Sequence, residues 1–399
     1  MQKEAISMYL SKKQGIQKTR ILDKIYTKGP ISRIEISKEL NITPATVSEI
    51  TNKLIDEKHI HELGEDETGN KPGRKKILLT ISSQHSYFIG VELSDKFLSF
   101  CLSDNLGSVI EQQILYHNSW DFQESFTETF FLEKMTQFIE QYTEYDPVAV
   151  GIAIPGHYDS ISQSIKTNHP FWQTFPLKDI IASIDLPVYF KNNVKCMAIA
   201  ERLFGEYKQD KNFIFLHVRR GMFCTYMYNG EIYAENNHLI GEIGHTVINP
   251  NGALCECGKR GCLQTYTSES WMIKKANLLY EDAPHTFLKQ LVAERKQIDI
   301  DTLIKAYQLG DEGSITIINQ AIHYFSIAIN NLLMIMDSDI VYIHSELFSE
   351  PELADLLVKC IDENASLLNL QHPKQRIFKR YDEINGALGA CGLCIYETL

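Results

Sequence analysis

The sequence predicts an α/β protein in which a small helical head precedes a larger body of two lobes. Helical patterns dominate residues 1–82, whereas short strands alternate with helices beyond them. Charge divides the chain at the same place, because the head holds 15 Lys and Arg against 11 Asp and Glu and the rest holds 24 against 40. A chain of 399 residues also exceeds one hydrophobic core, so two or three domains are expected.

Three helices are predicted in the head. A helix is predicted over residues 16–27, ended by Gly29-Pro30. Ser32 and Glu35 form a capping box at the start of a second helix. Thr43-Pro44, an N-cap followed by proline, starts a third helix that runs to about Lys58.

The second and third helices together describe a helix-turn-helix. Val47, Ile50 and Leu54 form the buried stripe of the third helix, so small polar residues face outward near its start. Such side chains let a helix approach base edges in a major groove. The predicted DNA-binding residues of this region are Thr43, Ala45, Thr46, Ser48 and Asn52.

A β-wing is predicted after these helices. Its return strand over residues 77–81 follows the basic run Lys71–Lys76, in which Arg74 is expected to contact phosphates or a minor groove. A mildly basic head on an acidic body favours duplex DNA as the partner of the head alone. The alternative is a helical protein-interaction module with a solvated basic loop.

Strands and helices alternate in the body. Three strands in succession are predicted near residues 87–116, followed by a helix at about 123–143 and a buried strand at 148–154. The alternation resumes with a strand at 188–193, a helix at 194–206 and a strand at 212–218. Residues 271–336 are expected to be largely helical, with a late strand at 340–344.

This recurrence predicts two related lobes with a cleft between them. The expected domains are residues 1–82 for the head, 83–194 for the first lobe and 195–381 for the second. The C-terminal helix, 382–399, is expected to complete the first lobe.

The most informative motif is a histidine followed by three closely spaced cysteines. His245, Cys255, Cys257 and Cys262 fall within 18 residues, in the proportion of a closed Cys3His zinc site. Gly258 and Gly261 allow the sharp turns that such convergence needs. The alternative is a group of buried free thiols.

Nine cysteines in all fit a reducing compartment better than a disulfide framework. The sequence contains no apolar run of membrane-spanning length, and its polar start lacks a signal-peptide core. A cytoplasmic protein without a membrane partner is therefore expected.

Four motifs together resemble the ROK family of sugar kinases and sugar-responsive bacterial repressors. They are Ile152–Gly156, Asn192-Asn193, Gly241–His245 and the cysteine cluster. The resemblance implies an actin-like, ribonuclease-H-type fold of two lobes, and the winged helix is similar to that of the repressor branch.

The resemblance also implies roles for individual residues. Zinc would be held by His245 and the three cysteines. Glu242 and His245 would face a sugar, and Gln264 stands where the family has a sugar-binding glutamate. The remaining residues that the resemblance places at the sugar are Gly156, Asn168, Asn192 and Asn193.

The kinase half of the family pattern is missing. Asn193 stands where a kinase has its aspartate base, and an amide cannot accept the proton of the attacked hydroxyl. The first phosphate loop carries Glu92 and Asp95, and the second, Val218–Phe223, has a single glycine. His344-Ser345-Glu346 replaces the glycine pair that admits adenosine. These losses predict a ligand sensor without enzymatic activity.

Two further motifs are ambiguous. Cys391 and Cys394 have redox spacing but lie in an apolar segment typical of a packed helix. Phe171-Trp172 fits sugar stacking and wall packing equally well.

The leading hypothesis is a sugar-responsive repressor that binds a palindromic operator as a homodimer or tetramer and is released by sugar. The alternatives are an active ROK sugar kinase with a fused DNA-binding head, and a repressor controlled by a phosphotransferase-system protein.

Overall fold

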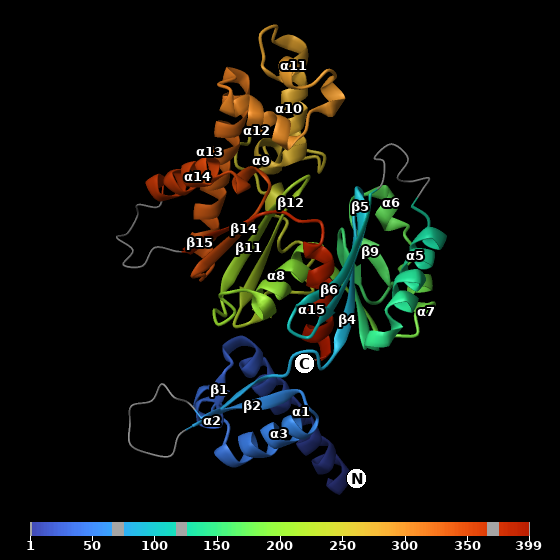
Figure 1. Ribbon diagram of the computed structural model, residues 1–399. Coiled ribbons are helices and arrows are strands. Elements are labelled where there is room, and N and C mark those ends of the chain that lie inside the picture. The colour runs from blue at the N-terminus through green and yellow to red at the C-terminus, as the bar shows by residue number, and fades with distance from the viewer. Residues whose placement is uncertain (1, 66–75, 117–125, 365–374, 399) are drawn as a thin grey trace. The chain divides into compact units, whose positions relative to one another are not determined.

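The computed structural model describes residues 2–65, 76–116, 126–364 and 375–398 (Figure 1). The chain divides into two compact units, Met1–Gln209 with Glu383–Leu399, and Asp210–Asp382. No helix in the described ranges is both long and apolar enough to cross a membrane.

The head is a winged helix, as predicted. Its helices are α1 (Gln2–Lys28), α2 (Arg33–Leu40) and α3 (Pro44–Asp56). Strands β1 (Ile31–Ser32), β2 (Ile60–Glu65) and β3 (Ile77–Ile81) form an antiparallel sheet in the order β1-β3-β2. The capping box of Ser32 and Glu35 and the Thr43 N-cap are both present. Helix α1 begins well before the predicted residue 16.

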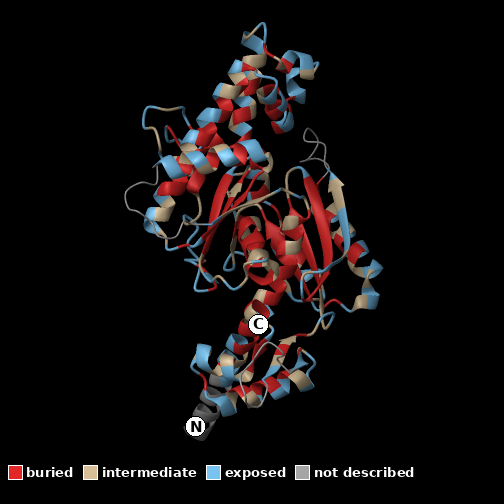
Figure 2. Cartoon of the chain, turned by 60° about the vertical axis from the view of Figure 1, so that its left-hand side comes forward, coloured by how far each residue is buried: buried red, intermediate tan, exposed pale blue. Residues whose placement is uncertain are grey.

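A five-stranded mixed sheet forms the centre of the first unit. Strand order is β10-β7-β4-β5-β6, with β4, β5 and β6 antiparallel and with β7 and β10 parallel to β4. The strands are β4 (Tyr87–Leu93), β5 (Phe97–Asp104), β6 (Val109–Tyr116), β7 (Ala149–Ile154) and β10 (Val188–Asn192). Buried residues concentrate on β4, β5, β7 and β10, whereas β6 is mostly exposed (Figure 2).

Other elements complete the first unit around this sheet. They are α5 (Glu128–Gln141), η1 (Thr143–Tyr145), β8 (His157–Asp159), β9 (Ser164–Lys166), α6 (Pro170–Gln173), α7 (Leu177–Ala182), α8 (Asn193–Phe204) and α15 (Asn385–Thr398). Helix α15 lies directly against the sheet at Gly90, where an added Cβ would lie 1.9 Å from the Ala387 carbonyl oxygen.

The division between the two compact units lies further along the chain than the predicted boundary between the lobes, after residue 194. Helix α8 belongs to the first unit, and the division falls at Gln209 and Asp210. The reason is packing, because α8 contacts α15 so closely that a Cβ at Gly389 would lie 2.6 Å from the Cys196 carbonyl carbon.

The second unit repeats the topology of the first. Its strands are β11 (Phe213–Val218), β12 (Met222–Tyr228), β13 (Glu231–Ile232), β14 (Ile340–His344) and β15 (Gln375–Lys379). Their order is β13-β12-β11-β14-β15, again with three antiparallel strands followed by two parallel ones. The same strand order around an equivalent first strand confirms the predicted fold of two related lobes.

The helices of the second unit include those expected between residues 271 and 336. They are η2 (Ile243–His245), α9 (Gln264–Thr267), α10 (Glu269–Asp282), α11 (Leu288–Leu291), η3 (Arg295–Gln297), α12 (Ile300–Gln308), α13 (Glu312–Ile335), η4 (Leu347–Ser349) and α14 (Pro351–Asn364). Residues Phe325 of α13 and Leu357 of α14 share one core with Ile343 of β14. Figure 1 shows α13 and α14 beside strands β14 and β15.

Candidate functional site

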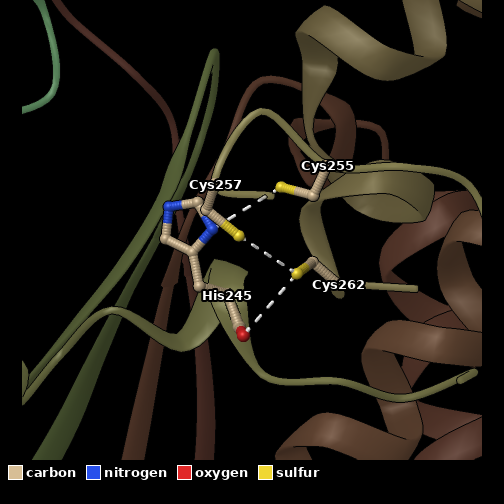
Figure 3. Close-up of side chains that lie close together, drawn as sticks. All are labelled: His245, Cys255, Cys257 and Cys262. Carbon is tan, nitrogen blue, oxygen red and sulfur yellow. Dashed lines mark hydrogen bonds between the residues drawn. The ribbon is translucent and has the colours of Figure 1, made fainter. Parts of the chain in front are cut away.

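One histidine and three cysteines of the second unit point toward one another (Figure 3). Their ligand atoms, one from each of His245, Cys255, Cys257 and Cys262, all lie within 4.8 Å of one another. The His245 Nδ1 is 3.6 Å from the Cys255 Sγ, and the Cys257 Sγ is 3.6 Å from the Cys262 Sγ. The sequence motif is thus a single cluster in space.

Short loops place these four side chains. The Cys255 amide donates to the Lys259 carbonyl at 2.8 Å, and the Gly258 amide donates to the Cys255 carbonyl at 2.9 Å, which closes a tight turn around Cys257. Gly261 has a φ of 68°, and a Cβ there would lie 1.5 Å from the Asn249 carbonyl oxygen. Only glycine fits this position, so the turn that presents Cys262 depends on it.

The chemistry of the cluster matches a structural zinc site. Three thiols and one imidazole are the ligand types of a closed tetrahedral Cys3His centre. Cys255 and Cys262 are buried. Burial and the neighbouring Cys257 thiol raise the pKa of Cys262 to about 12, so this thiol is protonated at pH 7. A bound zinc ion would favour the thiolate instead.

Gln264 lies beneath this loop. Its Nε2 donates to the Cys255 Sγ at 3.3 Å and to the Glu256 Oε1 at 3.0 Å, and the side chain is buried. Glu242 comes directly before the 3-10 turn η2 that carries His245. His245 and Gln264 therefore both contact Cys255 of the cysteine loop. Glu242 lies at the start of the turn that carries His245.

The sugar candidates of the first unit lie at the carboxyl ends of two neighbouring strands. Strands β7 and β10 are parallel, with Asn192 in register with Ile154. The Asn192 Nδ2 donates to the Gly156 carbonyl at 3.0 Å. Gly156 has a φ of 145° and packs on Thr167, next to the exposed Asn168. Gly156 and Asn192 are thus in direct contact, and Asn168 follows in the adjoining loop.

Asn192 also caps helix α8. Its Oδ1 accepts hydrogen bonds from the Val194 and Lys195 amides at 3.0 and 3.2 Å. Because the side chain is buried and bonded at both ends, its first role is to fix the loop and the helix start.

Asn193, at the first turn of α8, faces a carboxylate. Its Nδ2 donates to the Glu92 Oε1 at 3.2 Å, and Glu92 is buried on strand β4. Glu92 stands in the segment that corresponds to the first phosphate loop of the kinase pattern. In the structure, this carboxylate accepts from Asn193 and lies against Gly386 at the start of α15.

The residues that replace the remaining nucleotide loops pack on one another. The Arg219 guanidinium lies 3.5 Å from the Tyr381 ring centroid, and the His344 Nδ1 is 2.9 Å from the His217 Nδ1. Burial, together with the charge of Arg219, lowers the pKa of His344 to about 4, so this buried ring is neutral at pH 7.

Both ambiguous motifs are part of the core. Trp172 is 2% exposed and packs edge-on against Phe126 and Phe171, which favours wall packing over sugar stacking. Cys391 and Cys394 are free and fully buried on α15, as expected of structural cysteines in a packed helix.

The outer face of α3 carries the predicted DNA contacts. Thr43, Ala45 and Asn52 are exposed, and Thr46 and Ser48 are partly exposed. Arg33, which the sequence did not single out, donates to the Asn52 Oδ1 at 3.2 Å and to the Glu62 Oε1 at 2.9 Å. Arg33 thereby links the recognition helix to the wing. Arg74 lies outside the described residues.

A family model described as the ROK family matches residues 88–397. The chain belongs to the ROK family. A second model, described as the MarR family, matches residues 16–61, which contain the predicted helix-turn-helix.

Two relatives of the chain are named as transcriptional regulators. The chain is 26% identical over 316 residues to a xylose repressor of Bacillus spizizenii, covering 78% of this chain and 77% of the relative. It is 28% identical over 293 residues to the DNA-binding transcriptional dual regulator NagC of Escherichia coli K12, covering 71% and 68%.

A solved structure shares the whole fold. The crystal structure of a ROK family transcriptional regulator, a homolog of the E. coli MLC protein, superposes with a TM-score of 0.76. The two chains are 23% identical, and the superposition covers 96% of this chain and 97% of the other.

Proposed function

We propose that this ROK protein is a sugar-responsive transcriptional repressor of the cytoplasm without kinase activity. Its winged helix would bind a palindromic operator as a homodimer or tetramer, because a two-fold protein matches a two-fold site. A sugar bound by the body would release the DNA. Relatives named as a xylose repressor and a transcriptional dual regulator support this proposal over a kinase.

The observation that carries the proposal is the contact of Asn193 with Glu92. An amide cannot serve as the general base of phosphoryl transfer, and here it donates to a buried carboxylate 3.2 Å away. A second carboxylate at position 193 would face Glu92 directly. The surroundings of position 193 therefore suit an amide. In a protein with a DNA-binding head, ligand binding can serve regulation without any catalysis.

The sugar would be bound by Glu242 and His245, with Asn193 and Asn168 as further ligands. Gly156, Asn192 and Gln264 would act mainly by holding these loops, since Asn192 and Gln264 are buried and already bonded. Zinc would be held by His245 and the three cysteines. Its chemistry at this site is structural, because four protein ligands leave no open position for a substrate.

A mobility-shift titration against a panel of free and phosphorylated sugars tests the proposal. The DNA probe is an operator selected by the protein from random duplexes. At least one sugar should release this probe, since a ligand shifts an equilibrium by its differential affinity for two forms. A coupled ATP assay on the same samples should show no sugar-dependent turnover. Turnover of ATP would instead identify a kinase.

A further inference from the structure

Helix α8 joins the proposed sugar loops to the DNA-binding head within one unit. Its N-terminal end carries Asn192 and Asn193, and Asn192 ties the helix to Gly156. Its last turn carries Arg202, which contacts the head. The helix spans 12 residues, about 18 Å at 1.5 Å per residue. It is thus the shortest covalent path from the sugar candidates of the first unit to a head contact.

The contact with the head is a half-buried ion pair, in which the arginine is enclosed and the aspartate reaches the surface. The Arg202 Nη2 donates to both carboxylate oxygens of Asp23 on α1, at 2.8 and 3.0 Å. The Arg202 side chain is 3% exposed, whereas that of Asp23 is 38% exposed. Among the described residues, the Arg202 Nε and Nη1 have no hydrogen-bond partner.

Moving α1 of the head away from α8 would separate this ion pair, which costs free energy. A buried guanidinium that loses its partner leaves an uncompensated charge, which is strongly destabilising. Arg202 is paired with Asp23 of α1. Helix α1 and the end of α8 must therefore move together, or the ion pair breaks. An exposed ion pair of the same length would constrain the head far less.

Two neighbouring contacts restrict the same junction. Tyr26, three residues after Asp23 on α1, is buried and hydrogen-bonds the Asn105 side chain in the turn between β5 and β6. Phe204, two residues after Arg202, packs under Gly107 in that turn, where a Cβ would lie 2.5 Å from its ring. The head therefore contacts the body where α8 ends.

The body of α8 is held along its length. Eight of its residues are buried, and its backbone approaches α15 so closely at Gly389 that no side chain fits between the two helices. A packed helix moves as a unit, because interiors are close-packed and transmit displacement. A shift of its first turn is therefore carried to Arg202.

We propose that α8 transmits sugar binding to the head and that the Arg202–Asp23 ion pair is the contact through which the head follows. This inference rests on the proposed function, in which a sugar is the effector. The ion pair is a positioning contact, because neither residue is placed at the sugar or at the DNA.

The first test measures how strongly sugar weakens operator binding. Xylose and N-acetylglucosamine lead the panel, and the measured quantity is the ratio of operator Kd with and without sugar. The wild type should show a ratio of at least about tenfold, within the usual range of allosteric coupling. Asp23→Asn should reduce this ratio below about threefold, while sugar affinity in the absence of DNA stays unchanged.

Two further variants make this test specific. Asp56→Asn removes the same charge from an exposed position of the head and should keep the wild-type ratio. Asp23→Asn combined with Arg202→Met replaces the pair by uncharged groups and should fold while losing the coupling. A wild-type ratio in folded Asp23→Asn would overturn the proposal. A wild type that no sugar of the panel releases would contradict the proposed function, and the second test would then decide the link alone.

The second test needs no sugar. Asn192→Ala removes the cap of α8 and should accelerate amide hydrogen exchange in residues 20–28 of α1 by about threefold or more. When Asn192→Ala is added to the double variant Asp23→Asn, Arg202→Met, amide hydrogen exchange in α1 should stay at the rate of that double variant. Asp299→Ala, which removes the cap of α12 in the second unit, is the control. Faster exchange in α8 alone, with α1 unchanged, would show that the ion pair is merely structural.

Discussion

Cysteines in this protein occupy two different environments. Cys255, Cys257 and Cys262 converge with His245 on short loops, whereas Cys391 and Cys394 are enclosed by the apolar packing of α15. Thiols of the first kind have the arrangement of metal ligands, and we propose that they share one zinc ion. Thiols of the second kind act as small apolar side chains.

Cys257→Ser should therefore remove a metal that the wild type contains. Purified wild type should hold about one zinc per chain, and the variant much less, because a closed four-ligand site has no spare ligand. Elemental analysis of protein prepared without chelators measures this. Cys360→Ser, at a partly exposed cysteine of α14, is the control and should keep its zinc. A wild type free of zinc would disprove the metal site.

Asn193→Asp tests the electrostatics beside Glu92. The variant loses an amide donor to a carboxylate and gains a like charge, so it should be about 1.5–3 kcal/mol less stable at pH 7. Repulsion raises the pKa of the carboxyl pair, so the loss should shrink as the pH falls and the pair takes up a proton. Urea unfolding at pH 7 and pH 4 measures both effects.

The same variant also separates the base from the rest of the kinase machinery. It should gain no ATP turnover, because the phosphate loops are still occupied by charged and packed side chains. Asn229→Asp, at an exposed turn, is the control and should be near neutral in stability. Equal stability of Asn193→Asp and wild type at both pH values would rule out the proposed contact.

Helix caps determine where the head's helices begin. In α2, Ser32 accepts from the Glu35 amide, and Glu35 in turn accepts from the Ser32 amide and from Lys76 on the wing. The hydrogen bond from the Ser32 side chain, followed by that from Lys76, lowers the pKa of Glu35 to about 2. The capping box therefore also anchors the wing to α2.

Glu35→Gln should weaken the head by about 0.5–1 kcal/mol at neutral pH, since solvent screens this partly exposed group. A carboxyl with a lowered pKa stabilises the fold above its unfolded value of 4.5 and loses that contribution as the pH falls toward about 2. The wild type and the variant should thus differ at pH 7 and converge near pH 2. Thermal unfolding across this range measures the difference, and a constant difference would contradict the assignment.

The recognition helix and the wing should bind DNA in different ways. Asn52→Ala should cost about 1–3 kcal/mol on the cognate operator and relax discrimination at one base, because α3 presents this side chain outward. Arg74→Ala should weaken binding to all sequences and flatten the salt dependence. Binding titrations on operator and scrambled duplexes at several salt concentrations distinguish the two. Unchanged affinity in both variants would mean that the head does not bind the operator.

Local chemistry made much of this protein predictable. The caps of α2 and α3, the strands near residues 87–116 and the cysteine cluster are all encoded by neighbouring residues, and the structure contains them. The cap residues act within one turn, and the cluster is closed by loops of a few residues.

Contacts between distant segments were not predictable. The sequence of α8 shows an amphipathic helix but not the unit in which it packs, whereas the structure places it in the first unit, against α15. The pairing of Arg202 with Asp23 joins residues 179 positions apart, and no local pattern marks it. The same holds for Glu92, whose partner Asn193 lies 101 residues away.

The whole molecule, as proposed, converts sugar binding into release of DNA. The most direct measurement is a mobility-shift titration of operator-bound wild type and Glu242→Ala with the releasing sugar, with Glu231→Ala at an exposed position as control. Wild type and control should release the operator at the same sugar concentration. Glu242→Ala should bind DNA normally but remain bound, because it lacks a proposed sugar ligand. Release of Glu242→Ala at the wild-type concentration would contradict the proposed effector site.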